Sequence, residues 1–173
     1  MLLRIYLSAI VISIVSIILL QGDIMAGTRN PSHYEQGHTI YVKSLKADTS
    51  GNLIEINGTR TPIDGTIIEI PQGALEREVK FSVGYDDGIL NLRSGKGSGT
   101  VIVLSTNPEV SFKKPVTIKI KFNTSINPRT IVGYEIDKLG FLHSLDIASI
   151  EKDKGCVSFY TYKPLMFTWV YIY

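Results

Sequence analysis

The sequence predicts an all-β protein, an antiparallel β-sandwich of about nine to ten short strands. Three observations indicate this class. Apolar and polar residues alternate with period two in several segments, which is typical of half-buried strands. Gly, Asn and Asp separate these segments at short intervals, as turn residues do. After the N-terminal segment, apolar residues nowhere recur at spacings of three and four over a helical length.

The N-terminal segment, residues 1–26, is expected to be a signal peptide. Arg4 precedes an apolar run from Ile5 to Leu20, and the small residues Ala26 and Gly27 follow. The run is shorter than the roughly 20 residues that span a bilayer. We therefore expect export to the periplasm, the cell surface or the medium, with cleavage near Ala26. An uncleaved membrane anchor is the alternative, and only then would the membrane be a partner.

Residues 27–38 have no periodicity and are predicted to form a flexible arm. The remainder, residues 39–173, is predicted to be a single β-sandwich domain. Its only cysteine is Cys156, so no intramolecular disulfide can form. Burial of apolar side chains must therefore stabilise this domain.

The first predicted strands are short apolar runs at 39–43, 53–56 and 66–70, each followed by turn residues. The next strand, 78–85, alternates and places Val79, Phe81, Val83 and Tyr85 on one face. Residues 100–106 are apolar on both faces, so this strand is predicted to be buried between two layers. In 115–122, Val116, Ile118, Ile120 and Phe122 alternate with Thr117, Lys119 and Lys121. The remaining predicted strands are 131–137, 140–144, 146–151, 156–161 and 166–173.

The corner between two of these strands carries a family resemblance. Pro71 cannot donate to a ladder, so the strand ends there, and Leu75 is expected to pack back onto the core. The stretch from Ile68 to Leu75 resembles the Ile-x-Ile-Pro-x-Gly-Ala-Leu corner of ZU-five domains, β-sandwiches of ankyrins, zonula occludens scaffolds and netrin receptors. Phe112 to Ile118 is similar to their Phe-x-Lys-Pro-Val-x-Ile segment. The resemblance covers residues 63–172 and implies a protein partner.

The same resemblance raises the alternative of self-processing. Some proteins similar to this family, in the death-domain and inflammasome class, cut their own chain within His-Phe-Ser. Phe167 and Thr168 fall where that cut would be, but Met166 replaces the histidine, and a thioether cannot take a proton from a hydroxyl. We interpret the stretch as a core strand with alternating aromatic and β-branched faces. Cleavage between Phe167 and Thr168 is the alternative.

Four lysines are the candidate binding residues, and they lie in or just before one predicted strand: Lys113, Lys114, Lys119 and Lys121. They would form a cationic stripe beside Lys43 or Lys46. Such a stripe is usually a solvated face or a blunted sheet edge. Its functional interpretation is a contact surface for a partner.

Other classes of site find no support in the sequence. A net charge of +2 creates no field that would attract nucleic acid. The glycines of residues 93–100 have the wrong spacing for a phosphate-binding loop. His33 and His38 offer too few ligands for a metal, and residues 86–88 are an acidic turn. No cofactor or catalytic motif is present. The sequence therefore predicts an exported, non-enzymatic module that binds a protein or has a structural or adhesive role in the cell envelope.

Overall fold

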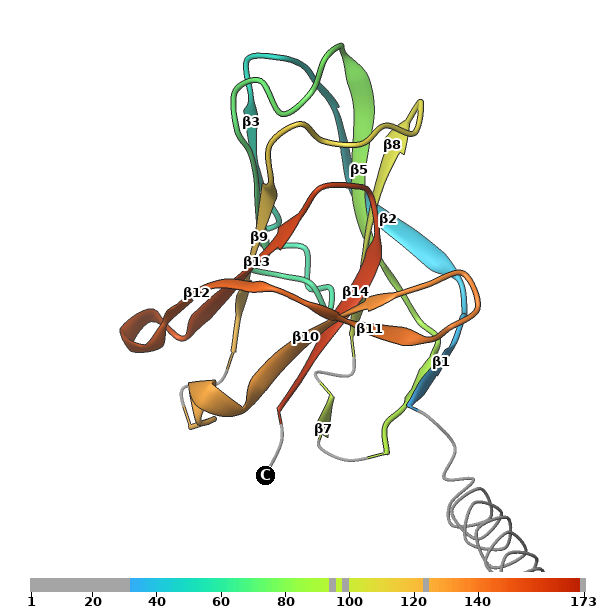
Figure 1. Cartoon of the computed structure of the whole chain (residues 1–173), viewed down its shortest axis with the longest axis vertical. Coiled ribbons are helices and arrows are strands. Elements are labelled where there is room, and N and C mark those ends of the chain that lie inside the picture. Colours follow the sequence, from blue (N-terminus) through green and yellow to red (C-terminus); the bar gives the residue numbers. More distant parts are fainter. Residues whose placement is uncertain (1–31, 94–95, 98–99, 123–124, 172–173) are drawn as a thin grey trace, which may run out of the picture. The chain divides into compact units, whose positions relative to one another are not determined.

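The structure, a computed structural model, describes residues 32–93, 96–97, 100–122 and 125–171. This part of the chain is all-β, with strands β1 to β14 and two short 3-10 turns. The strands form three antiparallel sheets (Figure 1). The predicted signal peptide and the last two residues of the predicted C-terminal strand lie outside the described residues. Within those residues no helix is long and apolar enough to cross a membrane.

The large sheet has seven strands. Six of them follow the order β11-β10-β14-β8-β5-β2, and the seventh, β7, pairs with the C-terminal end of β14. Every neighbouring pair is antiparallel. A register shift between Tyr41 and Lys43 interrupts the pairing of β2 with β5. The strands are β2 (Thr39–Ala47), β5 (Val79–Asp86), β7 (Lys96–Gly97), β8 (Val101–Asn107), β10 (Ile131–Ile136), β11 (Leu142–Leu145) and β14 (Met166–Tyr171).

The small sheet has five strands in the order β12-β13-β9-β4-β3. In β9, Val116, Ile118 and Ile120 are buried whereas Lys121 is exposed, which confirms the predicted alternation. The strands are β3 (Asn52–Glu55), β4 (Ile67–Ile70), β9 (Val116–Lys121), β12 (Ile147–Glu151) and β13 (Cys156–Thr161). The 3-10 turns are η1 (Pro128–Thr130), which precedes β10, and η2 (Lys152–Lys154), which joins β12 to β13.

The main core lies between the inner faces of these two sheets. Phe159 of β13 packs against Phe167 of β14, with ring centroids 5.9 Å apart. Phe81 of β5 stacks on Phe112, which precedes β9, at 6.1 Å. Both pairs join one sheet to the other, so burial of aromatic area fixes how the sheets face each other. Along the side where β2 and β3 end the sheets, the Lys43 ammonium donates to the Glu55 carbonyl at 2.9 Å.

A second, smaller core covers the outer face of the large sheet. It contains Tyr34, Val101 and Ile136, with Leu90 and Met166 packed against them. Every residue from Val101 to Leu104 is buried. The prediction that this strand is buried on both faces is therefore confirmed.

The predicted flexible arm is wrong over residues 33–35. These residues form β1 (His33–Glu35), which pairs with β6 (Ile89–Asn91) and leaves Tyr34 only 1% exposed. We call residues 33–39 the strap. The prediction failed because one buried side chain between polar neighbours produces no periodicity. Three short strands, β1, β6 and β7, were not predicted. The strands β1 to β14 exceed the nine to ten expected, even without these three.

The predicted corner at residues 68–75 is confirmed as a structural feature. β4 ends at Ile70, and Gly73 adopts a positive φ of 75° that favours glycine. Ala74 and Leu75 are buried in the main core. The Lys113 amide donates to the Ala74 carbonyl at 2.9 Å, which ties the corner to the segment before β9.

Packing across the core generates a first prediction. A Cβ atom at Gly133 of β10 would overlap the ring of Phe159, which is fully buried. We expect Gly133→Ala to lower the free energy of unfolding by about 1–3 kcal/mol, because an overfilled core must shift its backbone or rotamers. Urea denaturation measures this change.

The matched control is the double variant Gly133→Ala/Phe159→Leu. Since leucine leaves room beside the new methyl group, the added methyl should cost less in this background than in the wild type. Equal costs in both backgrounds would show that overlap with Phe159 is not the cause.

Candidate functional site

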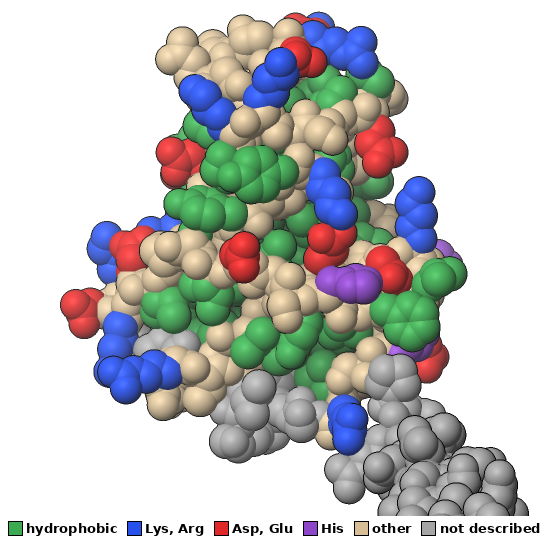
Figure 2. Space-filling model, in the orientation of Figure 1, with side chains coloured by type: hydrophobic (Ala, Val, Ile, Leu, Met, Phe, Trp, Pro, Cys, Tyr) green, Lys and Arg blue, Asp and Glu red, His purple; other side chains and the backbone are tan. Residues whose placement is uncertain are grey.

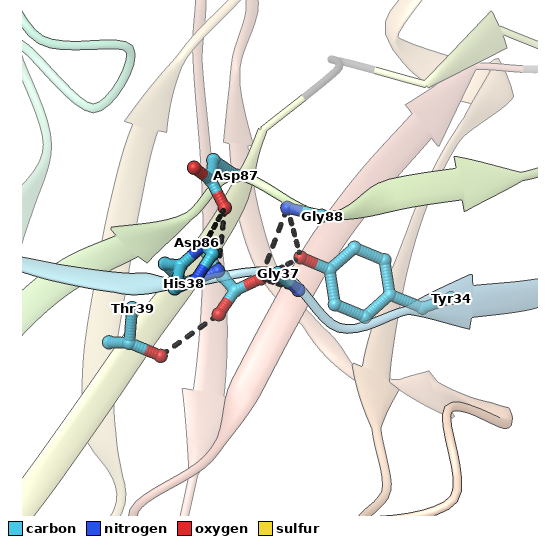
Figure 3. A network of polar contacts seen from close by, with 7 residues as sticks. All are labelled: Tyr34, Gly37, His38, Thr39, Asp86, Asp87 and Gly88. Atoms are coloured by element: carbon cyan, nitrogen blue, oxygen red, sulfur yellow. Dashed lines mark hydrogen bonds and ion pairs between the residues drawn. The ribbon is translucent and has the colours of Figure 1, made fainter.

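The carboxylate of Asp86, at the end of β5, holds the strap in place (Figure 3). It accepts hydrogen bonds from the Gly37 amide at 2.7 Å, the Thr39 hydroxyl at 2.9 Å and the Gly88 amide at 3.1 Å. The Tyr34 hydroxyl also donates to it. Next to this network, the His38 amide donates to Asp87 at 2.6 Å.

Charge and burial explain the chemistry of this network. Burial alone would raise the pKa of Asp86, but hydrogen bonds from Tyr34, Gly37, Thr39 and Gly88 lower it below its usual value. Burial and the bond to Asp86 raise the pKa of Tyr34. The carboxylate is ionised and its donors are committed to it, so it is suited to anchoring the strap rather than to moving protons. The sequence predicted an acidic turn here and missed this anchor.

A groove opens between the two sheets, on the side where the chain passes from β11 to β12. We call this hollow of about 500 Å³ the side groove, and its floor reaches the core residue Phe112. Its lining residues are Ser111, Phe112, Glu135, Ser144, Leu145, Asp146, Tyr160, Thr161, Tyr162 and Lys163.

Two tyrosines give the side groove an exposed aromatic rim. Tyr160 is 43% exposed and Tyr162 is 58% exposed. Tyr160 belongs to β13, and Tyr162 lies in the bend that follows Thr161, the last residue of that strand. Both side chains combine an apolar ring with a polar hydroxyl, a combination enriched in binding surfaces.

An ion pair separates the side groove from a second hollow. Lys163 and Glu135 are 2.7 Å apart and line both spaces. The second hollow also measures about 500 Å³ and lies beside the strap, so we call it the strap hollow. Its other lining residues are Gln36, Leu104, Ser105, Thr106, Glu109, Ile136, Asp137, Lys138, Pro164, Leu165 and Met166. The surface seen in Figure 2 has apolar, acidic and basic side chains interspersed.

The four candidate binding lysines are not equivalent in the structure. Lys113 forms an ion pair with Glu76, and the Lys114 ammonium donates to the Gln72 carbonyl at 2.7 Å. Both follow the groove residues Ser111 and Phe112 directly in the chain.

The other two lysines lie on the outer face of β9. Lys119 pairs with Glu151, which also binds Lys154 at 2.7 Å, and these two lysines lower the pKa of Glu151 to about 2. The Lys121 side chain lies over Gly65. In the register, Lys119 is opposite Ser158, two residues before Tyr160, so the lysine face continues to the aromatic rim.

Thr168, the alternative nucleophile, is fully buried in β14. Its hydroxyl donates to the Thr100 carbonyl at 2.9 Å, at the point where pairing of β14 changes from β8 to β7. His143 of β11 is paired with Glu135 of β10, so β10 lies between it and Phe167 of β14, and its ring lies 2.9 Å from Asp137. The Thr168 hydroxyl therefore has a structural role, because it provides a hydrogen bond to a backbone carbonyl where the strand pairing is interrupted.

The other two histidines, His33 and His38, contact different residues. His33 packs edge-on against Phe141, with ring centroids 5.7 Å apart. His38 lies 3.7 Å from Asp87. Among the residues that the structure describes, no three His, Cys, Asp or Glu side chains converge as metal ligands would.

The chain matches no protein-family model, and no curated protein is significantly similar to it. The ZU-five resemblance therefore stays a prediction, which rests on the motifs at residues 68–75 and 112–118.

The Asp86 network generates a second prediction. We expect Asp86→Asn to lower the free energy of unfolding at neutral pH by about 2–3 kcal/mol, because a charged acceptor of buried hydrogen bonds is lost. Since the pKa of Asp86 is lowered by folding, its stabilisation is fully present above the unfolded pKa of about 3.9 and is lost as the pH falls through the native value. The gap between wild type and variant should close in acid. Urea unfolding from pH 7 to pH 3 measures it.

Asp87→Asn is the control, because Asp87 is half exposed and contacts the neighbouring His38. It should cost less than about 1 kcal/mol. A stability gap for Asp86→Asn that stays constant down to pH 3 would contradict this account.

Proposed function

We propose that this protein is an exported, non-enzymatic binding module that captures a protein partner at the side groove. One observation carries the proposal: two exposed tyrosines stand on the rim of a groove whose floor reaches the core. Tyrosines are enriched in protein interfaces, because a rigid ring buries large area at little cost in conformational entropy. Isolated exposed apolar groups need no explanation, whereas a pair beside a hollow does.

The neighbouring lysines extend this surface. Lys113 and Lys114 follow the groove residue Phe112, and Lys119 and Lys121 lie on the strand paired with β13. Charged residues around an apolar centre affect the rate of association and the choice of partner more than the affinity. In this proposal the tyrosines supply the binding energy, and the lysines form a rim that selects a partner with acidic groups beside the part that enters the groove.

Export is the second part of the proposal, and it rests on the N-terminal segment. A cationic start, a short apolar run and small residues near Ala26 are the parts of a secretory signal. The partner is then expected in the periplasm, at the cell surface or outside the cell.

Photo-crosslinking in the native host tests the binding surface. We expect a photoreactive phenylalanine analogue at Tyr162 to link the full-length protein to one partner species. The same analogue at Tyr41, an equally exposed tyrosine on β2, should yield at least about fivefold less of that species. Tyr160→Ala should reduce the crosslink from position 162, because half of the aromatic rim is lost.

Charge reversal tests the rim in the same cells. Lys113→Glu, Lys119→Glu and Lys121→Glu together should weaken the crosslink from position 162. Equal crosslinking from positions 41 and 162, or none from either, would contradict the proposed surface.

The intact mass of the protein from fractionated cells tests export and self-processing together. We expect a chain that begins near Gly27 and ends at Tyr173. The hydroxyl of Thr168 is buried and donates to a carbonyl, so no fragment ending at Phe167 should form. A mass that retains residues 1–26 would indicate an anchored protein, and a fragment ending at Phe167 would make Thr168 a nucleophile.

A further inference from the structure

We propose that the side groove binds an extended segment of the partner and that arginine or lysine side chains of this segment lie against Tyr160 and Tyr162. This inference rests on the proposed function and specifies the chemistry of the partner. Three features carry it: the local charge, the aromatic rim and the position of β11 as the end strand beside the groove.

The groove and the hollow next to it are locally negative on a chain of positive net charge. The chain carries +2. Negative charge in the groove favours a cationic segment of the partner over an anionic one. The side groove is lined by Glu135, Asp146 and Lys163, and the strap hollow by Glu109, Glu135, Asp137, Lys138 and Lys163, so each has a local net charge of −1.

The aromatic rim selects the same kind of side chain. A guanidinium or ammonium group over a tyrosine ring is attracted by the negative face of the ring. Tyr160 and Tyr162 lie in one groove with Asp146 and Glu135, so a cation that contacts a ring also has carboxylates nearby. The aliphatic stem of the same side chain can cover the apolar floor at Phe112 and Leu145.

The strand edge beside the groove favours an extended segment. β11 is the end strand of the large sheet, and Ser144 and Leu145 of this strand line the groove. The Tyr160 amide and the Asp146 carbonyl, 3.4 Å apart, join the two walls at one end. An end strand presents backbone groups that can pair with an added strand. A bound segment that pairs with β11 would place alternate side chains towards the tyrosines.

Fluorescence anisotropy with the full-length protein tests the proposal. The probe is a fluorescein-labelled, end-capped octapeptide of alternating Arg and Thr, and the comparison peptide has Glu in place of each Arg. We expect the Arg peptide to bind at least about tenfold more tightly than the Glu peptide. Tyr160→Ala/Tyr162→Ala should weaken the Arg peptide about five- to thirtyfold, as expected for loss of two exposed cation–π contacts.

A gain of affinity provides a test that misfolding cannot mimic. Lys163→Gln removes the ammonium group paired with Glu135, so this carboxylate becomes available to the peptide. We expect the Arg peptide to bind this variant about two- to fivefold more tightly. Tyr41→Ala is the matched control and should leave the affinity unchanged.

Backbone pairing has its own probe. An Arg peptide with N-methyl groups on alternate residues keeps its charge but loses donors on one edge, and it should bind at least about fivefold more weakly. Equal binding of the methylated peptide would overturn the extended-strand part of the proposal.

The peptide affinities and the crosslink together decide between the two proposals. Equal affinity for the Arg and Glu peptides, or Arg binding unaffected by loss of both tyrosines, would overturn the inference. If the native partner still crosslinks at position 162 in that case, the proposed function stands and only the chemistry of the partner is wrong. If that crosslink is also absent, both proposals fail.

Discussion

Apolar contact between the inner faces of two sheets is the constraint on which every other part of this structure depends. With one cysteine in the chain, no intramolecular bond between sulfur atoms can hold the sheets together. The contacts Phe159–Phe167 and Phe81–Phe112 cross from one sheet to the other instead. The groove is a consequence of the same arrangement, since it forms where the sheets part at the passage from β11 to β12.

A different kind of interaction holds the layer outside the large sheet. The strap contributes one large buried side chain, Tyr34, and its remaining stabilisation comes from polar contacts to Asp86. A buried carboxylate is costly unless donors surround it. Here amides and hydroxyls from both the strap and the turn after β5 do so. Among the described residues, no buried side-chain nitrogen or oxygen lacks a hydrogen-bond partner.

The parts of the fold that were predictable depend on local periodicity. The alternation in β9 and the two apolar faces of β8 are properties of consecutive residues, so they can be read from the chain. β1 was missed because the signal for its burial is a single tyrosine, and the carboxylate that anchors it comes 52 residues later.

The candidate site was less predictable than the fold. The direction of Lys119 followed from its strand, but its pairing with Glu151 depends on the neighbour strands β13 and β12. The groove brings together residues as distant as Ser111 and Lys163, and no local pattern marks them. The exposure of Tyr160 and Tyr162 beside this groove depends in the same way on the neighbouring strands.

The rate at which a thiol reagent modifies the buried Cys156 reports local opening of this structure. Its side chain is 7% exposed, and its sulfur lies 3.4 Å from the Lys154 carbonyl at the start of β13. A thiol reagent must therefore wait for this end of the strand to open before it reacts. Because the chain has no other thiol, the rate of modification reports the opening of one defined place. The opening rate of this part of the small sheet can thus be measured in the unaltered protein, without an introduced label.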